Sequence, residues 1–250
     1  MSGSDGSAPL CPEPILLAIE TAGSRCSTAI ARGSKILATE SRQLRHGHGE
    51  ALMPMVDRVM AEAALSPREL DIVAAAIGPG GFTGIRVGLA AARGIALATG
   101  ARLIGVTGFA AVAHALRRKN RVRSLNGTLL LVALDSRRDD LYVQVFVLDT
   151  IAPLTQPQTV LPDRLADWVG ALAGSPPLLI AGDAMGEAAA ALEERVGFDV
   201  VPDSAPDAVG VAAAALEAAR SAPGEPVRPL YIRPPDVTLP KPHGIAGVSR

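Results

Sequence analysis

The motif most suggestive of chemistry is GPGGFTGIR, residues 78–86, which lies between an expected strand and an expected helix. Backbone N–H groups at the start of a helix can hold a phosphate, so Gly80 and Gly81 are candidate phosphate contacts. The motif lacks the Lys-Ser/Thr pair of a P-loop, and Thr83 stands where a dinucleotide-binding fingerprint has glycine. The alternative interpretation is structural: several of these positions need a positive φ angle or a close approach of two backbones.

Histidine and nucleophile patterns give no support for a catalytic site. Two histidines four residues apart on a helix would place both rings on one face, as a metal site needs. His46, His48, His114 and His243 include no such pair, and His46 and His48 fall in an expected loop. No H-E-x-x-H or G-x-S-x-G motif occurs, and Cys26 has no base nearby in sequence. We therefore expect no catalytic residue, no metal and no cofactor.

The composition excludes several classes of protein. Hydrophobic residues make up 48% of the 250 residues and the mean hydropathy is +0.28, so the chain can bury a sizeable core. A net charge of −1 provides no overall attraction to nucleic acid or to an anionic membrane. Aromatic residues, at 3%, are too sparse to favour a base-stacking platform. Cys11 and Cys26 cannot build a disulfide framework, which favours a reducing compartment.

The sequence also argues against a membrane span. The longest apolar stretch, residues 84–100, is interrupted by Arg86 and Arg93 and is shorter than the roughly 20 apolar residues that a spanning helix needs. Residues 1–14 lack the basic and apolar regions of a signal peptide. We expect a soluble, cytoplasmic protein without a membrane partner.

The elements that would position these motifs follow the same order twice. The first half has the pattern strand-strand-strand-helix-strand-helix-strand-helix, expected at residues 15–20, 27–32, 35–40, 50–64, 71–77, 84–99, 102–106 and 108–118. The second half repeats this order at residues 128–134, 141–148, 158–161, 163–173, 178–181, 184–194, 200–201 and 205–220. Pro54 is tolerable only near a helix start, so the first helix is expected to begin at about Met53.

This repetition predicts two tandem α/β lobes with a cleft between them. We expect a flexible leader over residues 1–14, an N-terminal lobe over 15–120, a C-terminal lobe over 121–222 and an extended tail over 223–250.

Four segments together resemble the TsaB (YeaZ) family: the glycine-rich motif, ILLAIET at residues 15–21, HGEALMP at 48–54 and PLYIR at 229–233. The resemblance covers roughly residues 15–235. It implies two RNase H-like, actin-like lobes of the actin/Hsp70/sugar-kinase superfamily, each with a mixed sheet flanked by helices. It also implies a non-catalytic subunit of the bacterial machinery that places threonylcarbamoyl on adenosine 37 of tRNA. Glu20 replaces the family's usual Asp, and Gly81 stands where Ser is typical.

The same superfamily contains kinases and ATPases, which gives an alternative function. In such an enzyme, acidic residues at the ends of the two lobes' first strands position magnesium and nucleotide, and here they are Glu20 and Asp135. Glu20 is one methylene longer than the usual Asp, which matters where placement within about 0.5 Å is required. Asp135 also opens a hairpin loop of compensated charge, residues 135–140. A chaperone-like or protease-associated module is a second alternative that no residue supports.

The expected partner surface lies on two helices of the first lobe. Methionines are concentrated in the helix at residues 50–64, and Gly84, Gly88, Ala92 and Ala96 form a flat stripe on the next helix. These features also suit burial in the protein's own core. The family resemblance implies helix-helix contact with a partner, and we expect the interface at Leu52, Met53, Val56, Met60, Gly88 and Ala92.

The resemblance implies a set of partners as well. These are a catalytic TsaD-like paralogue, bound as a heterodimer, a second copy of this chain when the paralogue is absent, and a TsaE-like ATPase subunit on the assembled pair. tRNA would be reached only through this complex. The basic run at residues 117–123 could add a contact to the tRNA backbone, although cations at a helix end also complement the helix dipole.

Overall fold

The computed structural model describes residues 13–44, 46–118, 127–172, 177–193, 197–220 and 226–233. Several expected segments lie outside the described residues: residues 1–12 of the leader, residues 119–123 of the basic run, and residues 223–225 and 234–250 of the tail, which include His243.

The first half of the chain forms a five-stranded sheet in the order β3-β2-β1-β4-β5. Its elements are β1 (Ile15–Glu20), β2 (Arg25–Arg32), β3 (Lys35–Gln43), α1 (His48–Glu62), the short 3-10 helix η1 (Pro67–Glu69), β4 (Ile72–Gly78), α2 (Phe82–Thr99), β5 (Arg102–Thr107) and α3 (Gly108–Arg118). β1, β2 and β3 pair antiparallel, whereas β4 pairs parallel with both β1 and β5. This mixed sheet is the one that the run of three strands followed by alternating helices and strands predicts.

The second half repeats this topology in a sheet of order β11-β10-β6-β7-β8, with β9 also paired to β7. Its elements are β6 (Leu129–Asp135), β7 (Leu141–Val147), β8 (Ala152–Pro153), β9 (Gln158–Val160), α4 (Pro162–Gly170), β10 (Leu178–Ala181), α5 (Met185–Ala191), β11 (Phe198–Val200) and α6 (Ala208–Ala219). β8 is the strand that the sequence did not predict. The two tandem mixed-sheet α/β lobes are confirmed.

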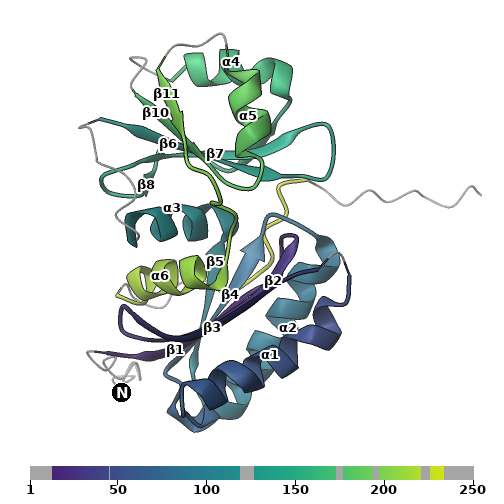
Figure 1. Ribbon diagram of the computed structural model, residues 1–250, viewed down its shortest axis with the longest axis vertical. Helices are drawn as coiled ribbons and strands as arrows, with labels where there is room; N and C mark the ends of the chain where they lie inside the picture. The colour runs from purple at the N-terminus through teal and green to yellow at the C-terminus, as the bar shows by residue number, and fades with distance from the viewer. Residues whose placement is uncertain are drawn as a thin grey trace, which may run out of the picture.

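The last helix of each half packs on the sheet of the other half. α3 lies on the second sheet through Phe109 and Val112, whereas α6 lies on the first sheet through Ala208 and Val211. Figure 1 shows α3 and α6 stacked between the two sheets. The division expected at residues 120 and 121 keeps each of these helices with the sheet of its own half, whereas the structure packs each on the other sheet. Apolar residues cover nearly the whole of α6, so its sequence does not tell which sheet it will contact.

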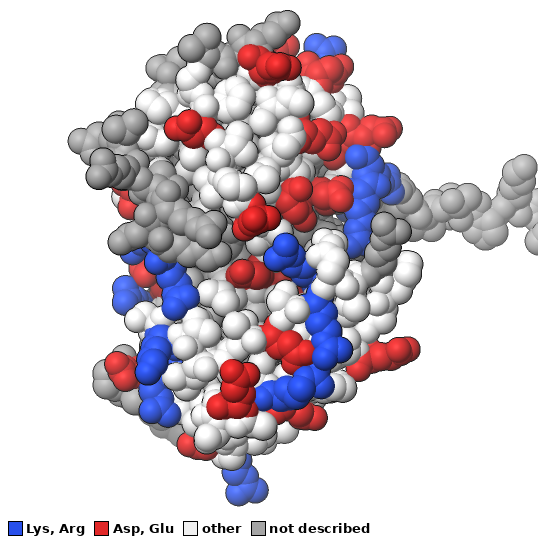
Figure 2. All heavy atoms as spheres, viewed as in Figure 1, with Lys and Arg blue, Asp and Glu red and all other residues white. Residues whose placement is uncertain are grey.

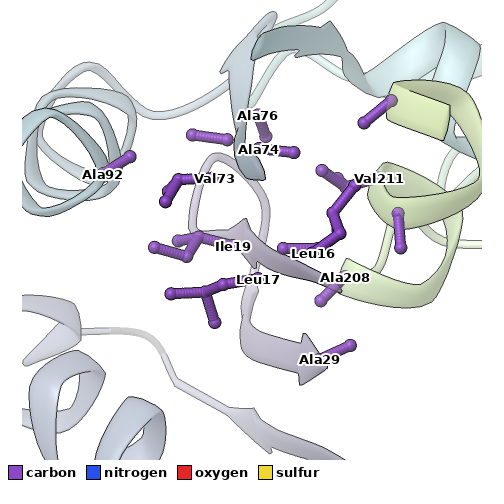
Figure 3. Close-up of a cluster of buried hydrophobic side chains, with 14 of the residues drawn as sticks. Leu16, Leu17, Ile19, Ala29, Val73, Ala74, Ala76, Ala92, Ala208 and Val211 are labelled. Carbon is purple, nitrogen blue, oxygen red and sulfur yellow. The ribbon is translucent and has the colours of Figure 1, made fainter. Parts of the chain in front are cut away.

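The core of the first lobe is a layer of strands between two layers of helices. Leu17, Ile19 and Val73 project from β1 and β4 toward Ala92 of α2, and Leu16 projects toward α6 (Figure 3). α1 lies beside α2 on the same side of the sheet (Figure 1). This side therefore has two covering helices, and their outward faces are the outside of the molecule.

α1 begins five residues earlier than the proline suggested. The helix starts at His48 and contains Pro54 in its interior. Proline has no N–H, so the carbonyl of Glu50 loses its i+4 donor. Glu50 and Pro54 are both exposed, so water can satisfy this carbonyl and the helix continues. His48 is consequently the first residue of a helix, not part of a loop.

Residues 226–233 form an extended segment that contacts both lobes. The N–H of Leu230 donates to the carbonyl of Ile77 in β4 at 2.7 Å, and the Arg93 guanidinium donates to the carbonyl of Val227 at 2.7 Å. Arg233 forms an ion pair with Asp140 of the second lobe. Figure 1 shows the segment in yellow, rising beside β4 to the junction between the lobes.

Two properties of the described residues bear on function. None of their helices is long and apolar enough to cross a membrane. On the face shown in Figure 2, Lys and Arg side chains lie among Asp and Glu side chains, consistent with the net charge of −1.

Candidate functional site

The turn between β1 and β2 packs directly against the backbone of the glycine-rich motif. The N–H of Gly81 donates to the carbonyl of Ala22 at 2.8 Å. A Cβ atom at Gly80 would lie 2.3 Å from that carbonyl oxygen, and one at Gly84 would lie 2.0 Å from the carbonyl oxygen of Thr21. The structure therefore supports the close approach of two backbones as the reason for these glycines. The Gly81 N–H, a candidate phosphate donor, already has a partner.

The small-residue stripe of α2 continues this contact along the helix. The Thr21 hydroxyl donates to the carbonyl of Gly84 at 2.8 Å, and a Cβ atom at Gly88 would lie 2.3 Å from that hydroxyl oxygen. Ala92, one turn further along, is buried against the first sheet. The stripe lets α2 approach its own sheet, and no partner helix can reach it.

Five of the six residues expected at a partner interface are turned into the protein's own core. Leu52, Val56, Met60, Gly88 and Ala92 are buried in the first lobe. The reason is physical: a single apolar stripe on a helix is first used to cover the protein's own sheet. Met53 differs, since its side chain is 43% exposed.

The exposed sides of α1 and α2 nevertheless carry apolar residues. Leu97 is 88% exposed, and a Cβ atom at Gly94 would have nothing within 4 Å. We define the outer face of α1–α2 by its exposed apolar and small residues: Met53, Pro54, Ala90, Gly94, Leu97 and Ala98. The sequence signal for it was present in α2, where positions 90, 94, 97 and 98 lie on one side of the helix.

Glu20 lies fully buried at the end of β1, where it stabilises the β1–β2 turn. Its Oε1 accepts hydrogen bonds from the N–H groups of Ala22 at 2.6 Å and Gly23 at 3.1 Å. Its Oε2 is buried and has no hydrogen-bond partner among the described residues. Burial raises the pKa of Glu20 to about 7, because the turn N–H bonds only partly offset desolvation and the nearby charges of Asp183 and Asp207 add to it.

A small pocket between the lobes brings together Glu20, Gly80 and Asp135, three of the four nucleotide or phosphate candidates. The fourth, Gly81, lies close by, since a Cβ atom there would be 3.2 Å from an Arg137 nitrogen. The cavity measures about 30 Å³, which is room for about two water molecules. Nucleotide-sized ligands need sites of about 300 Å³ or more. The pocket as it stands does not accommodate a nucleoside triphosphate.

Arg137 of the second lobe reaches across this pocket and donates to the carbonyl of Gly23 in the first lobe at 3.3 Å. Within the second lobe, the N–H of Asp135 donates to Asp183 at 3.0 Å. Desolvation at the pocket raises the pKa of Asp183, with the Asp135 charge adding to the effect. Sequence reasoning missed Asp183, although its position just after the buried strand β10 resembles that of Glu20 at the end of β1.

The structure offers little to a metal ion. Within the described ranges, no group of three or more His, Cys, Asp or Glu side chains could hold one.

Burial lowers the pKa of both His48 and His114, and burial raises the pKa of the Cys26 thiol to about 11. Arg117 and Arg118 of the basic run end α3.

Comparisons with known proteins agree with this geometry. A family model for TsaD, the tRNA N6-adenosine threonylcarbamoyltransferase, matches residues 41–173. The chain is 30% identical over 137 residues to the tRNA threonylcarbamoyladenosine biosynthesis protein TsaB of Haemophilus influenzae, covering 54% of this chain and 55% of the relative. It is 32% identical over 127 residues to the TsaB protein of Escherichia coli, covering 51% of this chain and 52% of the relative. The chain thus spans about half the length of the curated relatives it matches.

A solved structure extends the similarity to nearly the whole fold. A Pseudomonas aeruginosa protein described as similar to the peptidase YEAZ superposes with a TM-score of 0.68 at 24% identity. The alignment covers 88% of this chain and 100% of the other. The shared architecture agrees with the actin-like two-lobed fold that the sequence predicted.

Proposed function

The chain belongs to the TsaB (YeaZ) family, and we propose on this basis that it is a non-catalytic subunit in the biosynthesis of threonylcarbamoyladenosine on tRNA. Its role is to bind and hold a catalytic TsaD-type paralogue as a heterodimer. A second copy of the chain occupies the same surface when the paralogue is absent. A TsaE-type ATPase subunit docks on the assembled pair.

The observation that carries this proposal is the contrast between a small interlobe pocket and an exposed apolar surface. The interlobe pocket measures about 30 Å³, and its Arg137 side chain donates to the carbonyl of Gly23 in the first lobe. The outer face of α1–α2 instead leaves Leu97 and Met53 in water. Burying a leucine or methionine side chain stabilises a complex by about 1.5–3 kcal/mol. Association that covers this face is therefore favourable.

Small residues strengthen the case for a helical partner. Ala90, Gly94 and Ala98 place no bulky side chain between α2 and an approaching helix. Gly94, in the middle of this helix, costs about 1 kcal/mol relative to alanine, and a Cβ atom there would meet nothing within 4 Å. The close approach of a partner's backbone would explain why glycine occupies this position.

Reconstitution of tRNA modification tests the proposed function. The TsaD-type protein of the same organism, ATP, threonine, bicarbonate and unmodified tRNA are incubated with and without this chain, together with the remaining pathway proteins. Mass spectrometry of the digested tRNA is expected to show the threonylcarbamoyl product only when the chain is present. Full modification without the chain would contradict the proposal.

The kinase or ATPase alternative makes the opposite prediction about the isolated protein. It requires magnesium-dependent binding of ATP by the chain alone, using Glu20 and Asp135 across the pocket. Isothermal titration of the purified chain with ATP and magnesium is expected to show no binding. Binding of ATP with a micromolar dissociation constant, abolished by Glu20→Ala, would overturn the non-catalytic assignment.

A further inference from the structure

Two aromatic side chains from distant parts of the chain form an exposed stack at the start of α2. The rings of Phe82 and Tyr231 lie with centroids 5.8 Å apart and an interplanar angle of 29°. Phe82 is 50% exposed and Tyr231 is 45% exposed. They are the two aromatic residues that the described part of the chain leaves exposed. Sparse aromatics argued against a base-stacking surface, yet the fold gathers these two at one place.

Contacts on both sides hold Tyr231 in position. Leu230, the residue before it, is bonded to β4 of the first lobe, and Arg233, two residues after it, is paired with Asp140 of the second lobe. The Arg86 guanidinium lies 3.5 Å from the centre of the Phe82 ring and donates to the Tyr231 hydroxyl at 3.3 Å. The stack is therefore presented on a rigid support, which lowers the entropy lost when a ligand binds.

The surroundings of the stack are basic. Arg86 and Arg93 project from α2, and Arg228 lies three residues before Tyr231; all three are exposed. Among the described residues none of these three arginines forms an ion pair. Residues 226–233 include no acidic side chain, and Asp140 is already paired with Arg233. Aromatic rings beside arginines whose charge no carboxylate neutralises match the chemistry of single-stranded nucleic acid, which offers bases for stacking and phosphates for the cations.

We propose that the Phe82–Tyr231 stack, with Arg86, Arg93 and Arg228, binds an unpaired segment of RNA. One base stacks against the aromatic pair, and the flanking phosphates contact the arginines. The choice of RNA rests on the proposed function, and it gives this chain a direct contact with tRNA in addition to the contacts made by its partners. Recognition is by stacking and charge, so it favours unpaired over duplex RNA without a strong sequence preference.

Fluorescence anisotropy of the full-length chain tests this site. The probe is a labelled RNA hairpin with a seven-nucleotide unpaired loop, and the comparison is a fully paired duplex of equal length. We expect the hairpin to bind more tightly than the duplex and Tyr231→Ala to weaken hairpin binding about tenfold, the usual effect of losing one base-aromatic stack. Tyr231→Phe keeps the ring and is expected to bind within about twofold of the parent protein.

A second variant covers the case in which Tyr231→Ala disturbs the fold. Arg228→Ala removes an exposed side chain and is expected to weaken binding and to lower the slope of log affinity against log salt by about one. Leu154→Ala, at an exposed site of the second lobe, is the matched control and leaves binding unchanged.

Three results would overturn the proposal. These are equal affinity for hairpin and duplex, unchanged binding by both Tyr231→Ala and Arg228→Ala, and loss of protein-partner capture by Tyr231→Ala with RNA binding intact. The last result would make the stack a protein contact. The anisotropy assay contains no partner and measures no modification, so its failure is distinguishable from failure of the proposed function.

Discussion

The inner and outer faces of α2 contain similar small residues but meet different surroundings. On the inner face, Gly84 and Gly88 lie against Thr21, with no space for a Cβ atom. On the outer face, a Cβ atom at Gly94 would have nothing within 4 Å, and Leu97 extends into water. The comparison teaches that spacing alone identifies a face suited to close packing, whereas only the fold tells whether that face is already occupied.

The largest change in stability is expected from a substitution on the inner face of α2. In Gly84→Ala protein the new Cβ atom would lie 2.0 Å from the carbonyl oxygen of Thr21, a backbone atom that cannot move aside alone. We expect the free energy of unfolding to fall by at least about 3 kcal/mol, the upper range for overpacking, with loss of soluble protein as the extreme outcome. Urea unfolding measures the effect. A variant as stable as the parent protein would show that α2 does not approach the turn this closely.

A smaller and pH-dependent effect is expected at Glu20, which holds the turn that the inner face contacts. The pKa of Glu20 is raised from 4.5 to about 7, so the folded protein favours the protonated carboxyl. The stabilisation is complete below about pH 4.5 and is lost as the pH rises through about 7, by about 3 kcal/mol in total. Glu20→Gln mimics the protonated form and keeps an oxygen for the turn.

Unfolding measured from pH 5 to pH 8 tests this prediction. The parent protein should lose stability with increasing pH, and Glu20→Gln protein should show a flatter profile and become the more stable of the two at pH 8. The raised pKa of Asp183 leaves a smaller slope of the same sign in both proteins. Identical profiles would mean that the Glu20 carboxylate is solvated.

The smallest change in stability is expected from a substitution on the outer face of α2, and it is a stabilisation. Gly94→Ala is the matched change to Gly84→Ala in the same helix, and its Cβ atom meets nothing. Replacing an exposed glycine in a helix by alanine should raise the free energy of unfolding by about 0.5–1 kcal/mol. Thermal unfolding of the two variants side by side gives the comparison. A destabilised Gly94→Ala monomer would mean that the outer face is packed within the chain.

Much of the fold could be predicted from the sequence because its elements are strongly marked. Buried strands such as β1 and β4 are nearly pure apolar runs. Gly33 marks the turn between β2 and β3, and Gly100 marks the end of α2. The exchange of α3 and α6 between the sheets could not be predicted. It depends on a crossing where Gly210 packs against the Ala111 carbonyl, a contact that no local pattern records.

The site was predicted less well than the fold. Glu20, Gly80 and Asp135 do meet, because strand ends at one edge of each sheet face the junction between the lobes. Most residues expected at the interface are buried in the first lobe, since the periodic apolar positions of α1 and α2 face the sheet. The exposed Leu97 lies off the buried stripe of α2. Tyr231 joins Phe82 only through the path of residues 226–233, which has no periodic pattern to read.

The central claim is that the outer face of α1–α2 docks a TsaD-type subunit, and one measurement tests it most directly. Isothermal titration of the TsaD-type protein of the same organism compares the parent chain with Leu97→Asp, which places a charge on the outer face, and with Leu154→Asp, an exposed leucine of the second lobe. The account predicts binding at least about tenfold weaker for Leu97→Asp, unchanged binding for Leu154→Asp, and similar melting temperatures for both. Parent-like affinity in Leu97→Asp protein would contradict it.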